Sequence, residues 1–300
     1  MKYILLILIF QIFNFPMAEL FANQKDSNTN KSHFDFNDLD TSLIEFIPAE
    51  TKPSKAITVV VHGLNNKPSI MKSICKMLSE HGSDVILIKL TGHRNDPQNL
   101  ANITRQIWLT DLLESHNYAK SLIESSEKKP LYFIGYSIGA LINLDLISSN
   151  PKLVHYDKMI LFAPANATKW STNLLKLSFS LGNEQKIPSF SPKDYRANDG
   201  IPIKAYIVLF EMKKSIENIN YKHLNIPTII IIDPKDETIS LRGLKKLKDK
   251  YDLYNWKIHI LDSQFVGKTY KYHHLIVDEI SMGTENWVSS CNMIRNFLNL

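Results

Sequence analysis

Six short, continuous apolar runs alternate with stretches of helical periodicity along this chain of 300 residues. The runs are rich in β-branched residues and span 56–61, 85–88, 131–134, 159–162, 228–232 and 256–261. Runs of this length without polar alternation are typical of strands buried on both faces, as in a parallel sheet. Between them apolar residues recur at helical spacing, for example at Ile70, Ile74 and Leu78. The alternation predicts an α/β fold with a mostly parallel central sheet covered by helices on both faces.

About 60 residues separate the fourth run from the fifth, and they break this alternation. A connection of that length without structure of its own is uncommon in a compact domain. We therefore predict a mainly helical cap over residues 165–225, inserted between two late strands of a core formed by residues 34–164 and 226–300. Apolar cap residues such as Trp170, Phe179 and Phe190 suit either a pocket for an acyl chain or packing between cap and sheet.

The N-terminal segment resembles a targeting sequence. Lys2 precedes the apolar run 4–10, and small residues follow at Ala18 and Ala22, a pattern typical of a secretory signal peptide. We expect residues 1–22 to be the signal, cleaved after Ala18 or Ala22, and residues 23–33 to form a flexible leader. The mature protein is then exported, without a membrane span. The mild net charge of +5 lacks a concentrated basic stripe, which argues against a nucleic-acid binder.

A nucleophile turn is predicted directly after the run 131–134. Residues 135–139 read Gly-Tyr-Ser-Ile-Gly, which is G-x-S-x-G between a strand and a helix. Such a sharp turn strains and exposes the serine, and neighbouring elements come so close that only glycine fits on either side. The helix N-terminus also favours developing negative charge. Ser137 is therefore the candidate nucleophile.

A serine nucleophile needs a general base, and the base needs a third group that fixes its tautomer. In this architecture the acid and then the base follow the serine in chain order. The turn after the run 228–232 offers Asp236 as the expected acid, with Asp233 and Glu237 as alternatives.

The loop after the last strand supplies the expected base. It carries two adjacent histidines, which periodicity cannot separate. We prefer His274, because the apolar residues that follow it would anchor a buried imidazole, and His273 is the alternative.

Two backbone amides are expected to form an oxyanion hole, which stabilises the tetrahedral intermediate of acyl transfer. One belongs to Ile138, the residue after the nucleophile. The other belongs to Leu64, because Gly63 in the loop after the first central strand can turn the chain inward. His62 is expected to be a structural hydrogen-bonding group under this loop rather than a base.

Together these features resemble the α/β-hydrolase superfamily, closest to its capped esterases and lysophospholipase-like serine hydrolases, over residues 57–300. The resemblance is carried by His62-Gly63-Leu64-Asn65, Thr91-Gly92-His93, the turn at 135–139, Asp236 and His274. It implies a triad of Ser137, Asp236 and His274, with no metal and no organic cofactor. Thr91 and Arg94 replace the first Pro and the last Gly of the family's Pro-Gly-His-Gly turn, so that loop gives no guide to the substrate.

The resemblance implies a carboxylesterase or a lysophospholipase- or lipase-like enzyme acting on a small acyl ester, with a lipid-derived ester expected before a short-chain one. The alternatives are a non-catalytic binding protein, or a peptidase or acyltransferase, since one fold supports many functions. The fold also places the first and last helices on one face of the sheet. Cys75 and Cys291 lie on those helices and form either a disulfide or, as the simpler expectation, two buried thiols.

Overall fold

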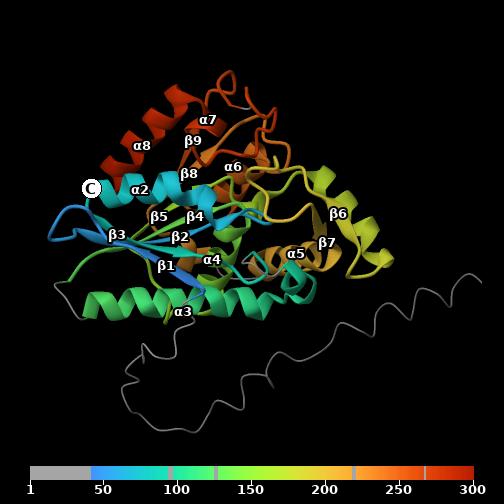
Figure 1. The fold of residues 1–300 in the computed structure, drawn as a ribbon, viewed down its shortest axis with the longest axis horizontal. Helices are drawn as coiled ribbons and strands as arrows, with labels where there is room; N and C mark the ends of the chain where they lie inside the picture. Colours follow the sequence, from blue (N-terminus) through green and yellow to red (C-terminus); the bar gives the residue numbers. More distant parts are fainter. Residues whose placement is uncertain (1–41, 94–96, 125–127, 218–220, 267) are drawn as a thin grey trace, which may run out of the picture. The chain divides into compact units, whose positions relative to one another are not determined.

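The computed structural model describes residues 42–93, 97–124, 128–217, 221–266 and 268–300 (Figure 1). A seven-stranded sheet with the order β1-β3-β2-β4-β5-β8-β9 forms its centre. The strands are β1 (Ile44–Ile47), β2 (Ala56–Val61), β3 (Ser83–Ile88), β4 (Leu131–Tyr136), β5 (Lys158–Phe162), β8 (Thr228–Ile232) and β9 (Trp256–Ile260). Every pair of neighbours is parallel except β1 and β3. The predicted α/β fold and its six strands are thus confirmed.

The burial of the strands explains why the sequence shows continuous apolar runs. Every residue of β2, β4 and β8 is buried, because helices or neighbouring elements cover both faces. The edge strand β1, which the sequence analysis did not predict, has only four residues with mixed burial. A strand so short and half exposed leaves no apolar run to detect.

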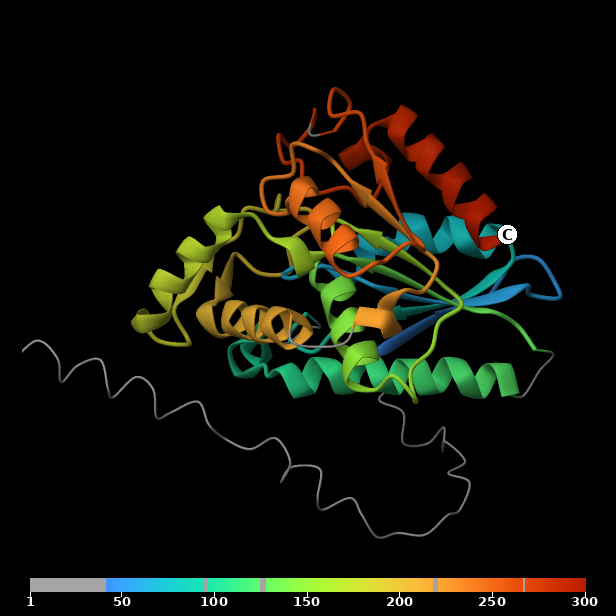
Figure 2. The same cartoon turned by 180° about the vertical axis from the view of Figure 1, so that it is seen from behind.

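Helices cover both faces of the sheet, as predicted. They are α2 (Lys72–Glu80), α3 (Arg105–Glu124), α4 (Ile138–Ser149), α5 (Ile203–Glu217), α6 (Leu241–Lys250), α7 (Glu279–Met282) and α8 (Thr284–Leu298). Figures 1 and 2 show α2 and α8 together on one face and α3 on the opposite face. Helix α4 packs against α3 and is buried along almost its whole length.

The insertion, residues 165–225, is mainly helical, but it also contains a small two-stranded sheet that the sequence analysis did not predict. Its elements in chain order are η4 (Ala165–Ala167), η5 (Trp170–Leu181), β6 (Lys186–Pro188), β7 (Gly200–Pro202), α5 and η6 (Tyr221–Leu224). Trp170 and Phe190 are each 77% exposed, so these two side chains do not pack against the sheet. Phe179 packs against Phe210 of α5, with ring centroids 5.9 Å apart.

The two cysteines are free thiols, as in the simpler expectation, but only one of the two is buried. Cys75 is buried in α2, and burial raises its pKa to about 12. Cys291 is half-buried in α8.

Among the described residues no helix is both long and apolar enough to cross a membrane. The predicted signal peptide and leader lie outside the described residues.

Candidate active site

The predicted site residues lie in loops at the carboxyl ends of neighbouring parallel strands. Leu64 follows β2 and Ser137 follows β4, whereas Asp236 follows β8 and His274 follows β9. The carboxyl ends of parallel strands share one edge of a sheet, which is where ligands bind in open α/β folds. Residues far apart in the chain therefore meet at this edge.

Ser137 occupies the strained turn that the sequence predicts. Its φ of 52° and ψ of −112° lie outside the ordinary regions for a residue with a side chain. A Cβ on Gly135 would come within 2.8 Å of the Ala140 backbone nitrogen. A Cβ on Gly139 would come within 2.6 Å of the His62 carbonyl oxygen. Glycine at 135 therefore lets β4 meet α4 at this angle, and glycine at 139 lets α4 begin against the end of β2.

A continuous chain of hydrogen bonds joins Ser137, His274 and Asp236. The Ser137 Oγ lies 2.9 Å from His274 Nε2, and His274 Nδ1 lies 2.8 Å from Asp236 Oδ2. Because a carboxylate only accepts, Nδ1 carries the proton and the unprotonated Nε2 accepts from the serine hydroxyl. Ser137 is 7% exposed, His274 6% and Asp236 0%. The structure thus brings the three predicted residues together in an arrangement that can relay a proton.

The turn after β8 fixes the carboxylate of Asp236. Its Oδ1 accepts hydrogen bonds from the backbone amides of Thr238 at 2.6 Å and Ile239 at 2.7 Å. These two hydrogen bonds fix the orientation of the carboxylate and leave Oδ2 directed at the imidazole.

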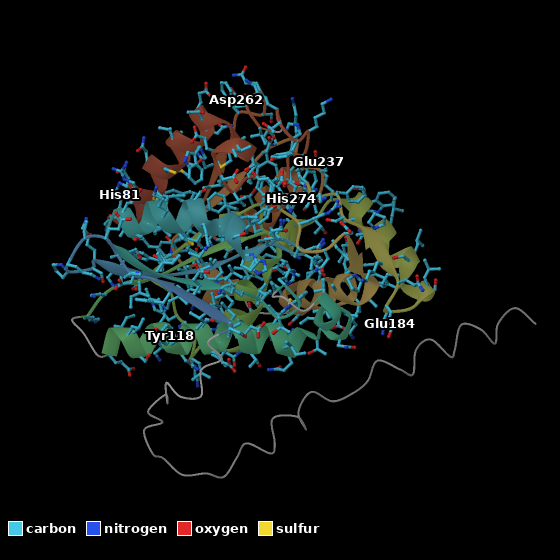
Figure 3. The ribbon with its side chains drawn as sticks, viewed as in Figure 1. His81, Tyr118, Glu184, Glu237, Asp262 and His274 are labelled. Carbon is cyan, nitrogen blue, oxygen red and sulfur yellow. The ribbon has the colours of Figure 1, made fainter. Side chains whose placement is uncertain are left out.

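Two further groups hold His274, and the sequence analysis did not assign them this role. Tyr136, the residue before the nucleophile, donates its hydroxyl to the His274 carbonyl at 3.0 Å, and its ring lies 5.3 Å from the imidazole. Glu237 accepts hydrogen bonds from the amides of His273 and His274, both at 3.0 Å. Glu237 and His274 are labelled in Figure 3. Glu237, which was an alternative acid, therefore anchors the backbone of the histidine loop.

The other two alternatives from the sequence analysis pair with each other. His273 Nδ1 lies 2.9 Å from Oδ2 of Asp233, whose carboxylate is completely buried. The Asp233 Oδ1 accepts from the Lys235 amide and from the Ser263 hydroxyl. A second histidine–aspartate pair, His273–Asp233, thus lies beside the first, but the imidazole bonded to Ser137 is that of His274.

The two amides expected to bind an oxyanion form no hydrogen bond with another described residue. They belong to Leu64 and Ile138. Beneath this loop His62 is fully buried, its Nδ1 lies 2.9 Å from the Gly63 carbonyl, and its Nε2 accepts from the Leu90 amide at 3.3 Å. Burial lowers the pKa of His62 to about 4, so it is a neutral structural group, as predicted.

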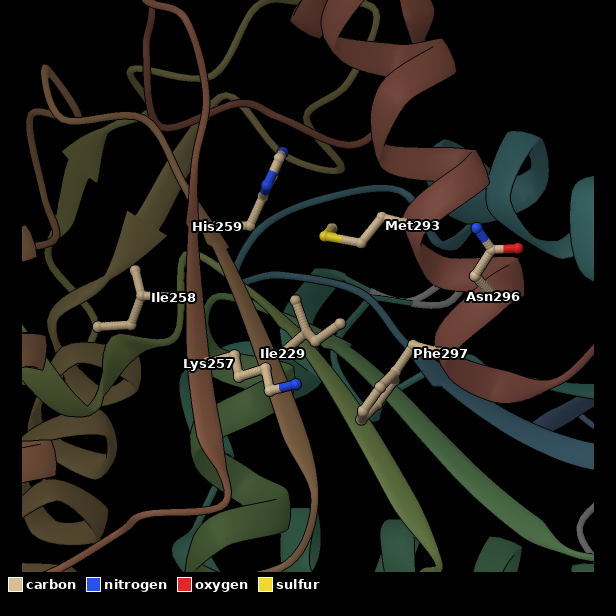
Figure 4. Close-up of a pocket in the computed structure, with 7 residues that line it drawn as sticks. All are labelled: Ile229, Lys257, Ile258, His259, Met293, Asn296 and Phe297. Carbon is tan, nitrogen blue, oxygen red and sulfur yellow. The ribbon is translucent and has the colours of Figure 1, made fainter.

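An open pocket elsewhere contains none of these residues. It lies between β9 and α8, and Ile258, Met293 and Phe297 are among the residues that line it (Figure 4). No group of three or more histidine, cysteine, aspartate or glutamate side chains in the described part of the chain is placed to hold a metal ion.

A parallel sheet that carries a nucleophile turn, then a carboxylate and then a histidine along the chain defines the α/β-hydrolase class of serine hydrolases. The family described as serine aminopeptidase, S33, matches residues 52–265, and the chain belongs to this family. No significantly similar sequence is found among curated proteins.

Solved structures of esterases and lipases share the fold. A soluble variant of monoglyceride lipase from Saccharomyces cerevisiae aligns with a TM-score of 0.69 at 13% identity, over 85% of this chain and 90% of that one. A structure from work on the metagenome-derived lipolytic enzymes LipS and LipT aligns with a TM-score of 0.64 at 16% identity, over 87% and 98%. Est1E from Butyrivibrio proteoclasticus, with bound ferulic acid, gives 0.56 at 17% identity, over 82% and 95%.

Proposed function

We propose that the protein hydrolyses carboxylic esters through an acyl-enzyme, with Ser137 as nucleophile, His274 as general base and Asp236 as the group that orients the base. The observation that carries the proposal is the unbroken chain of hydrogen bonds from the Ser137 hydroxyl to the buried Asp236 carboxylate. A serine hydroxyl is a weak nucleophile unless an adjacent base takes its proton, and this geometry supplies that base.

The reaction proceeds in two halves. The Ser137 Oγ attacks the carbonyl carbon while His274 Nε2 takes the hydroxyl proton, and the carbonyl oxygen becomes an oxyanion that the Leu64 and Ile138 amides stabilise. The intermediate collapses, the carbon–oxygen bond to the alcohol breaks, and His274 gives its proton to the leaving alcohol. Water then attacks the acyl-enzyme with His274 again as base, which releases the acid and restores the serine hydroxyl.

A lipid-derived acyl ester is the substrate class that the insertion favours. Its surface exposes five large apolar side chains: Trp170, Leu174, Leu177, Leu181 and Phe190. A gathering of exposed apolar side chains is typical of a surface that meets another apolar phase. The names of two fold relatives, a monoglyceride lipase and lipolytic enzymes, agree with this class.

Acyl-chain profiling tests the substrate class. With p-nitrophenyl esters of increasing acyl length we expect kcat/KM to rise into the long-chain range, because each buried methylene contributes about 0.8 kcal/mol. A maximum at acetate or butyrate would identify a short-chain esterase instead.

An aminopeptidase is the second candidate, because the matching family carries that description. Ester and amide hydrolysis use the same nucleophile and oxyanion site, so the leaving group decides between them. We expect faster turnover of a fatty acyl ester than of an aminoacyl amide bearing the same chromophore. The reverse ranking would assign the protein to the peptidases.

The nucleophile is tested by Ser137→Ala. We expect kcat/KM on p-nitrophenyl esters to fall by about 10,000-fold or more, because the residual rate comes only from binding and the oxyanion site. Ser171→Ala, at an exposed serine of the insertion, is the matched control and should keep the wild-type rate. Full activity of the Ser137→Ala variant would reject the proposed function.

Export is part of the proposal and rests on the N-terminal sequence alone. A charged residue, an apolar run and small residues at Ala18 and Ala22 are typical of a cleaved signal. N-terminal sequencing of the mature protein should begin at residue 19 or 23. An intact N-terminus on cytoplasmic protein would contradict export.

A further inference from the structure

The oxyanion loop, residues 62–68, is bonded to the insertion rather than only to its own strand. Asn66 and Arg196 form an antiparallel bridge between the loop and residues 194–199 of the insertion, here called the tie segment. The Lys67 amide donates to the Tyr195 carbonyl at 2.9 Å, and the Ala197 amide donates to the Asn65 carbonyl at 2.8 Å. The loop and the insertion thus share backbone hydrogen bonds, like two strands of a sheet.

The side chain of Asn65 is the centre of this junction. Its Nδ2 donates to the Asn198 carbonyl at 2.8 Å, while its Oδ1 accepts from the Asn198 amide at 3.0 Å and from Asn198 Nδ2 at 3.1 Å. Asn65 is fully buried and has a φ of 55°, a conformation that asparagine tolerates better than most residues. Asn65 therefore connects the oxyanion loop to the insertion through both its backbone and its side chain.

A further hydrogen bond connects Asn65 to the core. The Asn65 amide donates to His93 Nε2 at 2.7 Å. Burial, and to a smaller extent the neighbouring His62, lower the pKa of His93 well below its usual value, so Nε2 stays unprotonated and able to accept. Asn65 is thereby fixed from the core side by an imidazole and from the outside by the tie segment.

Asn65 directly follows a residue of the proposed oxyanion hole. That residue is Leu64, whose amide is the proposed second oxyanion donor. An oxyanion donor acts only when it is held in place before the charge develops, and small displacements at such a site are costly. The contacts that fix Asn65 therefore also fix the direction of the Leu64 amide.

We propose that Asn65 is a positioning residue that couples the insertion to the oxyanion loop, so that acyl transfer is efficient only while the tie segment is seated on the loop. The inference rests on the proposed function, because it assigns the Leu64 amide to the oxyanion. It predicts that loosening the insertion lowers the chemical step itself and not only substrate binding.

Asn65→Gly is the informative variant. Glycine accepts the positive φ, so the change removes the three side-chain hydrogen bonds without straining the backbone. We expect kcat on a soluble p-nitrophenyl ester, per active site titrated with a fluorophosphonate, to fall about tenfold, with KM changed by less than about threefold. That is a partial loss beside the 100- to 1,000-fold cost of removing an oxyanion donor outright.

Two further variants test how the fall in kcat depends on which contact of the tie segment is removed. Asn198→Ala removes only the Nδ2 contact to Asn65 and leaves the backbone bonds, so we expect a smaller fall in kcat than in Asn65→Gly. Tyr195→Phe is the matched control, because the Tyr195 hydroxyl joins the same segment to Asp278 on the other side, at 2.9 Å from its Oδ2, without touching the loop. It should keep kcat within about twofold if the connection to the loop, rather than general anchoring of the insertion, is what matters.

Hydrogen–deuterium exchange separates this proposal from the proposed function. In Asn65→Gly the amides of Lys67 and Ala197 should exchange faster together, while those of β8 keep their protection. Exchange that accelerates in the tie segment alone, or a kcat within twofold of wild type, would overturn the coupling. A wild-type protein inert toward every ester would overturn the proposed function, and the exchange result would still decide whether Asn65 joins the two regions.

Discussion

Two histidine–aspartate pairs lie side by side in this molecule. They differ mainly in the contact made by Nε2, the imidazole nitrogen that is not bonded to the aspartate. Both link the turn after β8 to the loop after β9, and their nitrogen–oxygen distances are 2.8 Å for His274–Asp236 and 2.9 Å for His273–Asp233. In each pair the carboxylate is fully buried. The His274 side chain is 8% exposed and bonds to the Ser137 hydroxyl, whereas the His273 side chain is 22% exposed.

A paired imidazole does not by itself make a catalytic base. Asp233 orients His273 in the same way that Asp236 orients His274, yet only one imidazole meets the nucleophile turn. The second pair helps to hold the loop that carries the base. The Glu237 carboxylate does the same, because it accepts hydrogen bonds from the amides of both histidines. We therefore expect equal substitutions in the two pairs to have very unequal effects on activity.

The largest contrast is expected between the two histidines. His274→Gln should lower kcat/KM on p-nitrophenyl esters by about 10,000-fold or more, because the hydroxyl loses its base. His273→Gln should lower it by less than about tenfold, equivalent to about 1.4 kcal/mol of transition-state stabilisation. Steady-state kinetics of both purified variants measure the contrast. Comparable losses in the two would show that the pairs work as one catalytic unit.

The two aspartates should differ in their effect on kcat, although both carboxylates are fully buried. Asp236→Asn should lower kcat by about 1,000- to 10,000-fold, because the amide favours the wrong tautomer of His274. Asp233→Asn should change kcat by less than about tenfold. Both variants should lower the free energy of unfolding by about 1–3 kcal/mol, because each buried carboxylate loses charge-assisted bonds. Urea unfolding and kinetics on the same preparations measure the two effects separately. A stable but inactive Asp233→Asn variant would contradict the assignment.

A buried histidine without a carboxylate partner, such as His62, should make the stability of the protein depend on pH. Burial lowers the folded-state pKa of His62 to about 4, against 6.5 in the unfolded chain. Below pH 6.5 the unfolded chain therefore takes up a proton that the folded protein excludes, and the stability contributed by neutral His62 is lost as the pH falls toward 4. The full difference corresponds to about 3 kcal/mol.

Unfolding free energies measured between pH 7.5 and 5 should decline on acidification, and the decline should be shallower in His62→Asn. If that variant does not fold, an NMR titration of the wild-type imidazole is the substitute, and His62 should stay neutral at pH 5.5. A protonated His62 at that pH would contradict the burial argument.

Much of the fold was readable from the sequence because its signals are local. Five of the six apolar runs became largely buried strands, whereas the sixth became the edge strand β9, in which only Trp256 is buried. The nucleophile turn followed from glycine spacing next to a strand. Chain order selected Asp236 and His274, and the structure places these two residues within hydrogen-bond distance of each other, because each follows a strand at the shared edge of the sheet.

Contacts between side chains of different loops could not be predicted from the sequence. Neither the contact between His273 and Asp233 nor that between Asn65 and Asn198 leaves a spacing pattern, because each joins loops that are far apart in the chain. Adjacent histidines have the same neighbours, so only the direction of each imidazole tells them apart. The β6–β7 hairpin escaped prediction because its strands have three residues each, too few to show alternation.

Covalent labelling can show whether Ser137 is the nucleophile and His274 its base. The mature protein is treated with a fluorophosphonate and digested, and the adduct is located by mass spectrometry. One adduct on Ser137, formed at near wild-type rate in His273→Gln and almost abolished in His274→Gln, is the predicted result. An adduct on another residue, or labelling of Ser137 that depends on His273 and not on His274, would contradict the account.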